Sequence, residues 1–362
     1  MRLYVEQGQS PWVAGLHRRP LRDGTLTRMV RNGIRGVVAQ PSGFAAALAS
    51  DSEYDEQLSS LVSSGHSADE AFREIVATDV ESACAVLRAV HRTSQGRDGY
   101  VSVEIPPTQV RGTRAAVMAA RWLHQRVDGA NLLVAVPASP EGTAAARTLV
   151  AEGRNVDVTA IFSLRQYAAA IEAYMAGLEA LVAQGGDPST VRGTASFEIA
   201  RVDDAVGLRL RERPSAATGV LLGHVALAQA RLAYRLFEQS FETDRWGRLA
   251  SLGALPQRLL WASVEGSGGL PGPWYVDRLV APDTVTAITA PMVPYYEAPA
   301  AVTGGSLLDV ETAEAADTLS HLGSLGIDLN ELADRLQADR AHATWRFVDD
   351  VLNRLHARRQ RS

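Results

Sequence analysis

Two strand-like segments of this sequence carry acidic side chains in an alternating pattern. Ser102 and Glu104 alternate with apolar residues in the segment 100–105, and Ser196 and Glu198 do so in the segment 194–200. Alternation places each pair on one face of its strand. Two carboxyl groups that meet in one cavity repel each other, so one is expected to hold its proton while the other is ionised. Such a pair is suited to general acid–base catalysis.

The other reactive residue types narrow the chemistry. All 36 basic residues are arginines, so the chain contains no lysine. A guanidinium stays protonated and is a poor nucleophile, and therefore no side chain of this protein can form an imine with a carbonyl compound. Cys84 is the only cysteine, which excludes a disulfide, and the eight histidines show no ligand-like spacing. We expect neither a metal nor a cofactor; a magnesium site on the acids alone is a weak alternative.

The elements that would position these residues follow a strand–helix alternation. Eight short apolar runs predict strands, at residues 11–16, 36–41, 100–105, 131–137, 157–162, 194–200, 259–264 and 284–289. Between them, apolar spacings of three and four predict helices over 115–127, 163–183 and 223–241. This pattern predicts an α/β fold, a (β/α)8 barrel, whose catalytic groups lie at the carboxyl ends of the strands. An open doubly wound sheet is less consistent, because no G-x-G-x-x-G motif follows the first strand.

Bulk properties fit one large domain. The chain has 362 residues, 46% of them hydrophobic, and a net charge of −5. We predict a single barrel domain over residues 1–362, in which residues 322–362 form a helical extension packed on the barrel, with two amphipathic helices after residue 327. The charge predicts no nucleic-acid partner, and no apolar run of 18 residues or signal-like segment is present, so neither a membrane nor export is expected. We expect a cytoplasmic protein.

An ordered series of motifs resembles the transaldolase family, particularly its actinobacterial branch. The series is GQSPWV at 8–13, PSGF at 41–44, DSEYD at 51–55, VSVEI at 101–105, NLLVAVPA at 131–138, NVDVTAIFS at 155–163, SF at 196–197, RVD at 201–203, ARLAY at 230–234, WAS at 261–263, YVD at 275–277 and PDTV at 282–285. No single motif is decisive, but together they span nearly the whole chain in order. The resemblance implies a transaldolase-type barrel of the class I aldolase kind.

The resemblance also implies that several family site residues are replaced. Transaldolases carry a Schiff-base lysine on the fourth strand, and this position is Ala135 here. The proton-transferring aspartate of the first strand corresponds to Ala14, and the asparagine that binds substrate hydroxyls corresponds to Gln40. A basic phosphate-binding residue beyond the seventh strand corresponds to Ser267. The chain is therefore expected to be a divergent member.

Other implied site residues are kept. Glu104 and Thr159 match the glutamate and threonine that hold the catalytic water, Ser196 and Ser263 match substrate-binding serines, and Arg201 matches the phosphate-binding arginine. Three alternatives stay open at this stage: Glu104 is kept only because it caps a hydrogen-bond network, Arg201 pairs with Asp203 or Asp204 instead, or Glu198, at a position usually aromatic, faces solvent.

These observations lead to a functional hypothesis. We expect an enzyme that is not a Schiff-base transaldolase, repurposed for acid–base chemistry of lyase, isomerase, hydrolase or cyclase type, with Glu104, Thr159 and Glu198 as catalytic residues. Its substrate would be a phosphorylated or carboxylated sugar-derived small molecule, in a secondary-metabolic pathway, and family habit suggests a homodimer. The alternative is an inactive barrel that serves as a binding or scaffold protein.

Overall fold

The strands form a closed parallel barrel. The computed structural model describes residues 6–105, 112–212, 218–266, 269–297 and 306–359. Eight strands follow one another in sequence order around the barrel and close between the last and the first. They are β1 (Ser10–Ala14), β2 (Gly36–Ala39), β3 (Tyr100–Glu104), β4 (Leu132–Pro137), β5 (Val156–Ile161), β6 (Gly193–Glu198), β7 (Arg258–Ala262) and β8 (Val285–Thr289). The predicted (β/α)8 barrel is confirmed, and each predicted strand overlaps an observed one.

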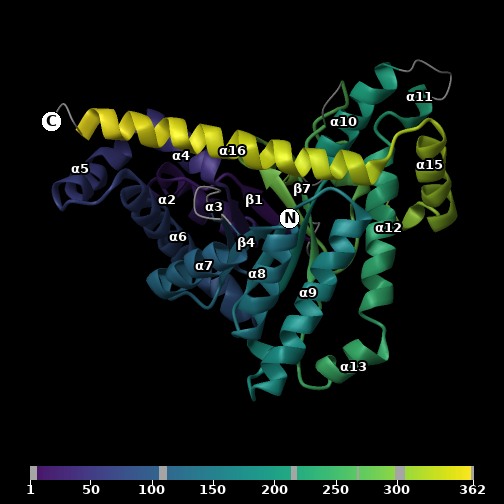
Figure 1. Cartoon of the computed structure of the whole chain (residues 1–362), viewed down its shortest axis with the longest axis horizontal. Coiled ribbons are helices and arrows are strands. Elements are labelled where there is room, and N and C mark those ends of the chain that lie inside the picture. Colours follow the sequence, from purple (N-terminus) through teal and green to yellow (C-terminus); the bar gives the residue numbers. More distant parts are fainter. Residues whose placement is uncertain (1–5, 106–111, 213–217, 267–268, 298–305, 360–362) are drawn as a thin grey trace.

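Helices surround the barrel (Figure 1). They are α2 (Arg18–Arg22), α3 (Thr25–Arg31), α4 (Pro41–Ser50), α5 (Asp55–Ser63), α6 (Ala68–Thr93), α7 (Thr113–Val127), α8 (Pro140–Ala151), α9 (Leu164–Ala183), α10 (Ala200–Arg211), α11 (Thr218–Leu221), α12 (Val225–Ser240), α13 (Asp244–Ala250), α14 (Val293–Glu297), α15 (Thr312–Ser324) and α16 (Leu329–Arg359). Local sequence explains where several of them begin. The Ser139 and Ser163 hydroxyls accept a backbone N–H in the first turns of α8 and α9, which satisfies one of the free donors of each helix start.

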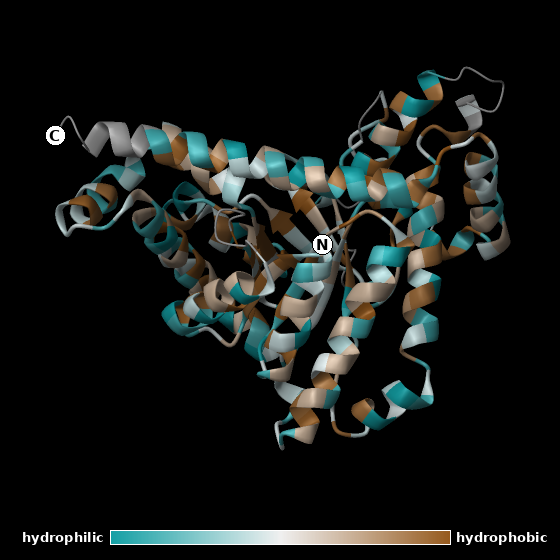
Figure 2. Ribbon diagram, viewed as in Figure 1, coloured by the Kyte–Doolittle hydropathy of each residue, from teal (hydrophilic) through white to brown (hydrophobic). Residues whose placement is uncertain are grey.

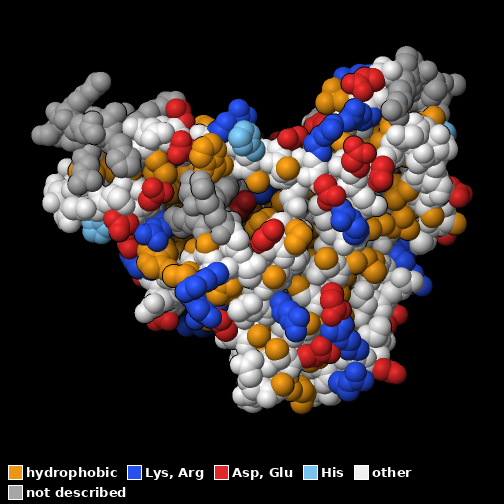
Figure 3. Space-filling view, in the orientation of Figure 1, with side chains coloured by type: hydrophobic (Ala, Val, Ile, Leu, Met, Phe, Trp, Pro, Cys, Tyr) orange, Lys and Arg blue, Asp and Glu red, His pale blue; other side chains and the backbone are white. Residues whose placement is uncertain are grey.

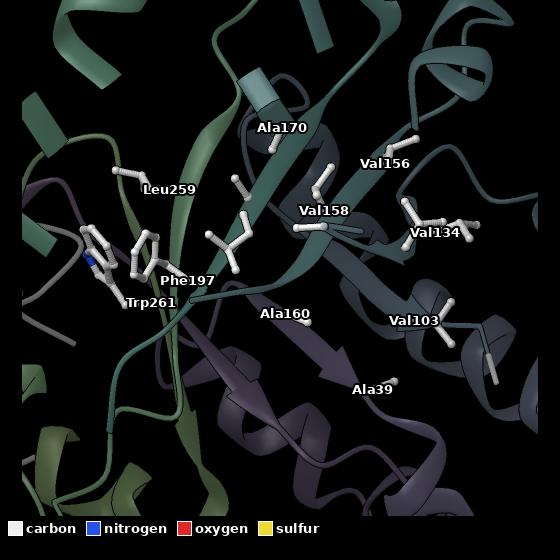
Figure 4. Packing of buried hydrophobic residues seen from close by; sticks show 14 of the residues in the cluster. Ala39, Val103, Val134, Val156, Val158, Ala160, Ala170, Phe197, Leu259 and Trp261 are labelled. Carbon is white, nitrogen blue, oxygen red and sulfur yellow. The ribbon is translucent and has the colours of Figure 1, made fainter. Parts of the chain in front are cut away.

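Strand alternation separates two apolar regions. The outward side chains, among them Val134, Val158 and Phe197, pack against the helix layer (Figure 4). The inward side chains form a second cluster in the lower barrel: Trp12, Val38, Tyr100, Leu133, Leu260, Ala262, Val285 and Ala287. This apolar layer separates the carboxyl-terminal mouth from a second polar group at the amino-terminal end of the barrel, where Asp98 accepts from Ser10 at 2.5 Å and from Arg258 at 3.0 Å.

The last helix, α16, lies across this mouth as one continuous element (Figure 1). The prediction of two helices after residue 327 is wrong, because residues 329–359 contain neither glycine nor proline to interrupt the helix. The coloured part of this helix in Figure 2 carries both hydrophilic and hydrophobic residues. Its amino-terminal half is fixed to the barrel by Gln337, which donates to the Ala160 carbonyl at 3.1 Å, and by Asp334, which accepts from Arg165 at 2.5 Å.

The described surface carries mixed charge. Acidic and basic side chains are interspersed over the face shown in Figure 3. In the described part of the chain, every helix is too short or too polar to span a bilayer.

Candidate active site

Three carboxyl groups point into the mouth of the barrel. Glu104 is the last residue of β3, and Glu198 is the last residue of β6. Asp157 is the second residue of β5 and lies deeper in the barrel. Their exposed fractions are 8%, 2% and 0%. Buried carboxylates need partners, because an unpaired ionised group is costly in a low-dielectric interior. As predicted, Glu104 and Glu198 line one cavity, and Glu198 does not face solvent.

Asp157 is held by the barrel itself. Its carboxyl group accepts from Ser102 at 2.7 Å and from Ser196 at 2.9 Å and 3.0 Å. Burial raises the pKa of Asp157, and the two serine hydroxyls oppose this shift. Ser196, predicted to bind substrate, is thus engaged with Asp157, and this buried network forms the floor of the mouth.

Arg340 of α16 supplies the positive charge between the other two acids. Its Nη1 and Nη2 atoms donate to the two carboxylate oxygens of Glu104, both at 2.8 Å, and its Nε lies 3.5 Å from Glu198. The Arg340 side chain is 11% exposed. Burial works against its charge, but the carboxylates of Glu104 and Glu198 outweigh burial and raise the pKa of Arg340. A bidentate, charge-assisted pair of this kind is among the strongest polar contacts in proteins.

The sequence analysis missed Arg340. It lies 236 residues from Glu104, in a helix whose basic side chains look solvated. One signal was available: inward acids at several strand ends, with no inward basic residue on those strands, require a cation from elsewhere in the chain.

A second arginine lies at the rim. Arg201, in the first turn of α10, lies 3.4 Å from Glu198, and its Nε donates to the Ser263 hydroxyl at 3.3 Å. Ser263 in turn donates to Glu198. The Arg201 side chain is 53% exposed, which leaves it open to an anion from solvent. The described contacts of Arg201 are with Glu198 and Ser263, and Asp203 instead accepts from the Ala226 amide and from Tyr275.

Ser263 reaches the mouth through an unusual backbone conformation. Strict alternation along 261–263 predicts that Trp261 and Ser263 share a face, and this prediction is wrong. Trp261 packs outside the barrel against Phe197, with ring centroids 6.3 Å apart (Figure 4). Ser263 follows the end of β7 in the left-handed region, at φ 52°, and this turn redirects its side chain toward Glu198.

The mouth contains two spaces, and Arg340 contributes to the lining of both. The inner cavity has a volume of about 20 Å³ and is lined by Ala135, Thr159, Ser196, Glu104, Glu198 and Arg340, among others. That volume is enough for about one water molecule. The outer pocket has a volume of about 200 Å³ and is lined by Gln40, Ser42, Glu104, Arg201 and Arg340, among others.

The remaining predicted site residues take distinct places. Gln40 is half-buried at the start of α4 and lines both spaces. Thr159 is buried, and its hydroxyl lies 3.5 Å from the Val136 carbonyl, at the limit for a hydrogen bond. Ala135 pairs in register with Glu104 on one side and Asp157 on the other. Ser267 lies outside the described residues. Among those described, no group of three acidic, histidine or cysteine side chains is arranged to hold a metal ion.

The fold and the mouth define a class: a (β/α)8 barrel with acidic and arginine side chains gathered at its carboxyl-terminal end. A profile of the family "Transaldolase/Fructose-6-phosphate aldolase" matches residues 21–355. The chain therefore belongs to the transaldolase/fructose-6-phosphate aldolase family.

Curated relatives are similar over nearly their whole length. A transaldolase of Thermobifida fusca is 37% identical over 352 residues, which cover 97% of this chain and 95% of that protein. A transaldolase of Arthrobacter sp. is 36% identical over 364 residues, covering 99% and 98%. Transaldolase 1 of Streptomyces coelicolor is 37% identical over 354 residues, covering 94% and 91%.

These relatives contradict the functional hypothesis drawn from the sequence. A barrel repurposed for other acid–base chemistry, or an inactive scaffold, is not what proteins named transaldolase indicate at this identity over nearly full length. The sequence argument gave the loss of one nucleophile more weight than the retention of the whole scaffold. The findings support an enzyme of transaldolase type.

Proposed function

We propose that this protein is a transaldolase that acts on a small phosphorylated sugar at the mouth of its barrel. The observation that carries the proposal is the 36–37% identity with named transaldolases over nearly the full length of both chains. The family description adds a concrete candidate substrate, fructose 6-phosphate. The secondary structure and the mouth are compatible with this reaction class, since aldol chemistry needs a closed polar site at the strand ends.

The outer pocket is the proposed place of the substrate. Arg201 is half-exposed there, at the first turn of the twelve-residue helix α10. A guanidinium and the positive end of a helix both favour a phosphate group. We assign Arg201 to the phosphate, Gln40 and Ser263 to sugar hydroxyls, and Glu104 to proton transfer. Thr159 and Ser196 are then part of the lower wall of the site, which holds the acidic side chains in position.

A second part of the proposal concerns the carbon–carbon bond step. We propose that it proceeds without an imine on any side chain. The chain has no lysine, and Ala135, at the position of the family's Schiff-base lysine, offers only a methyl group to the inner cavity. The proposed reaction is therefore that of a transaldolase, but without the covalent imine intermediate.

Two measurements test these parts separately. Purified protein is given fructose 6-phosphate with and without an aldose phosphate as acceptor, and the release of glyceraldehyde 3-phosphate is followed. In parallel, the protein is incubated with fructose 6-phosphate and sodium borohydride, and its intact mass is measured. We expect turnover together with an unchanged mass. A conventional transaldolase serves as the positive control for both the turnover and the adduct.

The outcomes are distinct. Absence of turnover with fructose 6-phosphate and a panel of other ketose phosphates would overturn the proposed activity. Turnover accompanied by a reduced adduct would overturn the second part only, and peptide mapping would locate the amine, which no side chain of this lysine-free sequence provides.

A further inference from the structure

The inner end of the mouth has a cation, although no strand provides one. The alanine that resembles the Schiff-base position, Ala135, and the guanidinium of Arg340 line the same inner cavity. The acids around it are Glu104, Glu198 and Asp157. A lysine ammonium on β4 would place its positive charge among these acids. In this chain the charge comes from α16 instead.

Arg340 retains donors for a ligand. A guanidinium has five N–H groups. The contacts described above direct one from Nη1 and one from Nη2 to Glu104, and the Nε–H toward Glu198. One N–H on each terminal nitrogen remains. Since Arg340 also lines the outer pocket together with Arg201 and Glu104, a molecule in that pocket can reach it without displacing the Glu104 pair.

The Arg340 head group is also held in place. Gln337, one turn earlier on α16, donates to the Ala160 carbonyl at 3.1 Å, and Asp334 pairs with Arg165 at 2.5 Å. The Glu104 pair fixes the plane of the guanidinium. A donor that is already oriented before the reaction stabilises developing charge without the cost of reorganisation.

We propose that Arg340 is a catalytic residue, which donates hydrogen bonds to the ketone oxygen of the substrate and stabilises the enediolate formed there. This inference rests on the proposed function. In the cleavage direction, the Glu104 carboxylate takes the proton of the β-hydroxyl group. The bond between the α and β carbons breaks, its electron pair moves toward the carbonyl, and the oxygen becomes an enediolate oxygen bound to Arg340. The β carbon leaves as an aldehyde. The enediolate then regains a proton at carbon from Glu104 or attacks an acceptor aldehyde.

Two substitutions and one control test the assignment. Arg340→Gln removes the charge and most donors, and Arg340→Lys keeps the charge between the carboxylates while losing the planar donor pair. Loss of one such oriented donor lowers kcat by about 10²–10³-fold, so both variants are expected to lose at least about 100-fold in kcat with KM for fructose 6-phosphate within about threefold. The control is Asp339→Asn, which changes an exposed acidic residue next to Arg340 on the same helix and should keep kcat within about threefold.

A second readout separates catalysis from support of the fold. Glycolohydroxamate mimics an enediolate and should inhibit the parent protein and Asp339→Asn equally. Its inhibition constant should rise at least about 100-fold in both Arg340 variants, while thermal unfolding confirms that the Arg340→Lys variant is folded. Borohydride treatment of Arg340→Lys identifies any new imine, and activity from that route is subtracted.

The inference is overturned if Arg340→Lys keeps parental kcat and parental inhibition without an imine, whatever the state of Arg340→Gln. If the parent protein turns over no ketose phosphate, the proposed function fails and this inference fails with it. Activity of the parent protein, measured first, therefore distinguishes the two failures.

Discussion

The pair between Arg340 and Glu104 predicts a large and specific loss of stability on substitution of the arginine. Arg340→Met replaces the guanidinium by an apolar side chain of similar length. The two side chains are 11% and 9% exposed, and the neighbouring Glu198 side chain is 3% exposed. The substitution leaves the buried Glu104 carboxylate without its cation, and leaves Glu198 with Arg201 alone.

The expected magnitude follows from this burial. Two unit charges about 4 Å apart interact by about 4 kcal/mol at an effective dielectric constant of about 20. Breaking a buried pair by removal of one partner costs about 3–5 kcal/mol, since the other charge remains uncompensated. We therefore expect Arg340→Met to lower the free energy of unfolding by about 3–5 kcal/mol at pH 7.5. Adding Glu104→Gln in the same chain should restore at least about 1 kcal/mol of unfolding free energy, because it removes the buried charge that has lost its cation.

Urea unfolding followed by tryptophan fluorescence and far-UV circular dichroism measures these differences, with the slope checked for constancy between variants. Arg165→Gln is the matched control: it breaks an ion pair on the same helix whose side chains are 56% and 59% exposed, and such surface pairs contribute at most about 1 kcal/mol. The reasoning is refuted if Arg340→Met costs no more than Arg165→Gln, or if the double variant is less stable than Arg340→Met.

Three further predictions concern parts of the fold away from Arg340. A Cβ added at Gly142 would lie 1.9 Å from the Pro137 carbonyl oxygen, whereas one added at Gly43 meets nothing within 4 Å. Gly142→Ala should therefore lower the free energy of unfolding, measured in urea, by about 3 kcal/mol or more. Gly43→Ala is the control and should leave it unchanged or raise it slightly. Burial raises the pKa of Asp203 to about 6, so its contribution to stability is fully present at low pH and is lost as the pH rises through about 6. Relative to Asp203→Asn, the free energy of unfolding of the parent protein should fall by up to about 3 kcal/mol between pH 4 and pH 7.5. A difference between the two proteins that does not depend on pH would contradict this assignment. Burial raises the pKa of the Cys84 thiol to about 12, so a disulfide reagent at pH 8 should label one thiol per chain in urea and almost none without it; rapid labelling of the folded protein would show that Cys84 is accessible.

The barrel was predictable because its strands are encoded locally. Short apolar runs such as Tyr100–Glu104 stand between helical patterns, and this alternation has few three-dimensional solutions. Alternation also placed Glu104 and Glu198 correctly on the inner face. It failed at Trp261 and Ser263, where a left-handed residue ends the strand early, because period-two reasoning assumes that extended backbone continues.

The contact that organises the mouth was not predictable in the same way. Arg340 and Glu104 are 236 positions apart, and no local pattern distinguishes Arg340 from the other arginines of α16. Only the three-dimensional path of a long helix across the barrel brings it to the acids. The local sequence pattern was enough to predict that the acidic side chains face inward. Only their need for a positive charge indicated that a basic residue from another part of the chain must reach them.

The origin of the cation has a consequence for how the mouth is built. A lysine on a barrel strand would carry its charge on the most rigid part of the fold. Arg340 is carried by α16, which packs on the barrel through buried apolar side chains and through polar contacts at Ala160, Arg165 and Glu104. The docked helix that covers the mouth therefore also supplies a cation to its acidic side chains. The acidic side chains of the barrel therefore favour the docked position of α16. In that position the remaining N–H donors of Arg340 face the outer pocket, where the proposed substrate would lie.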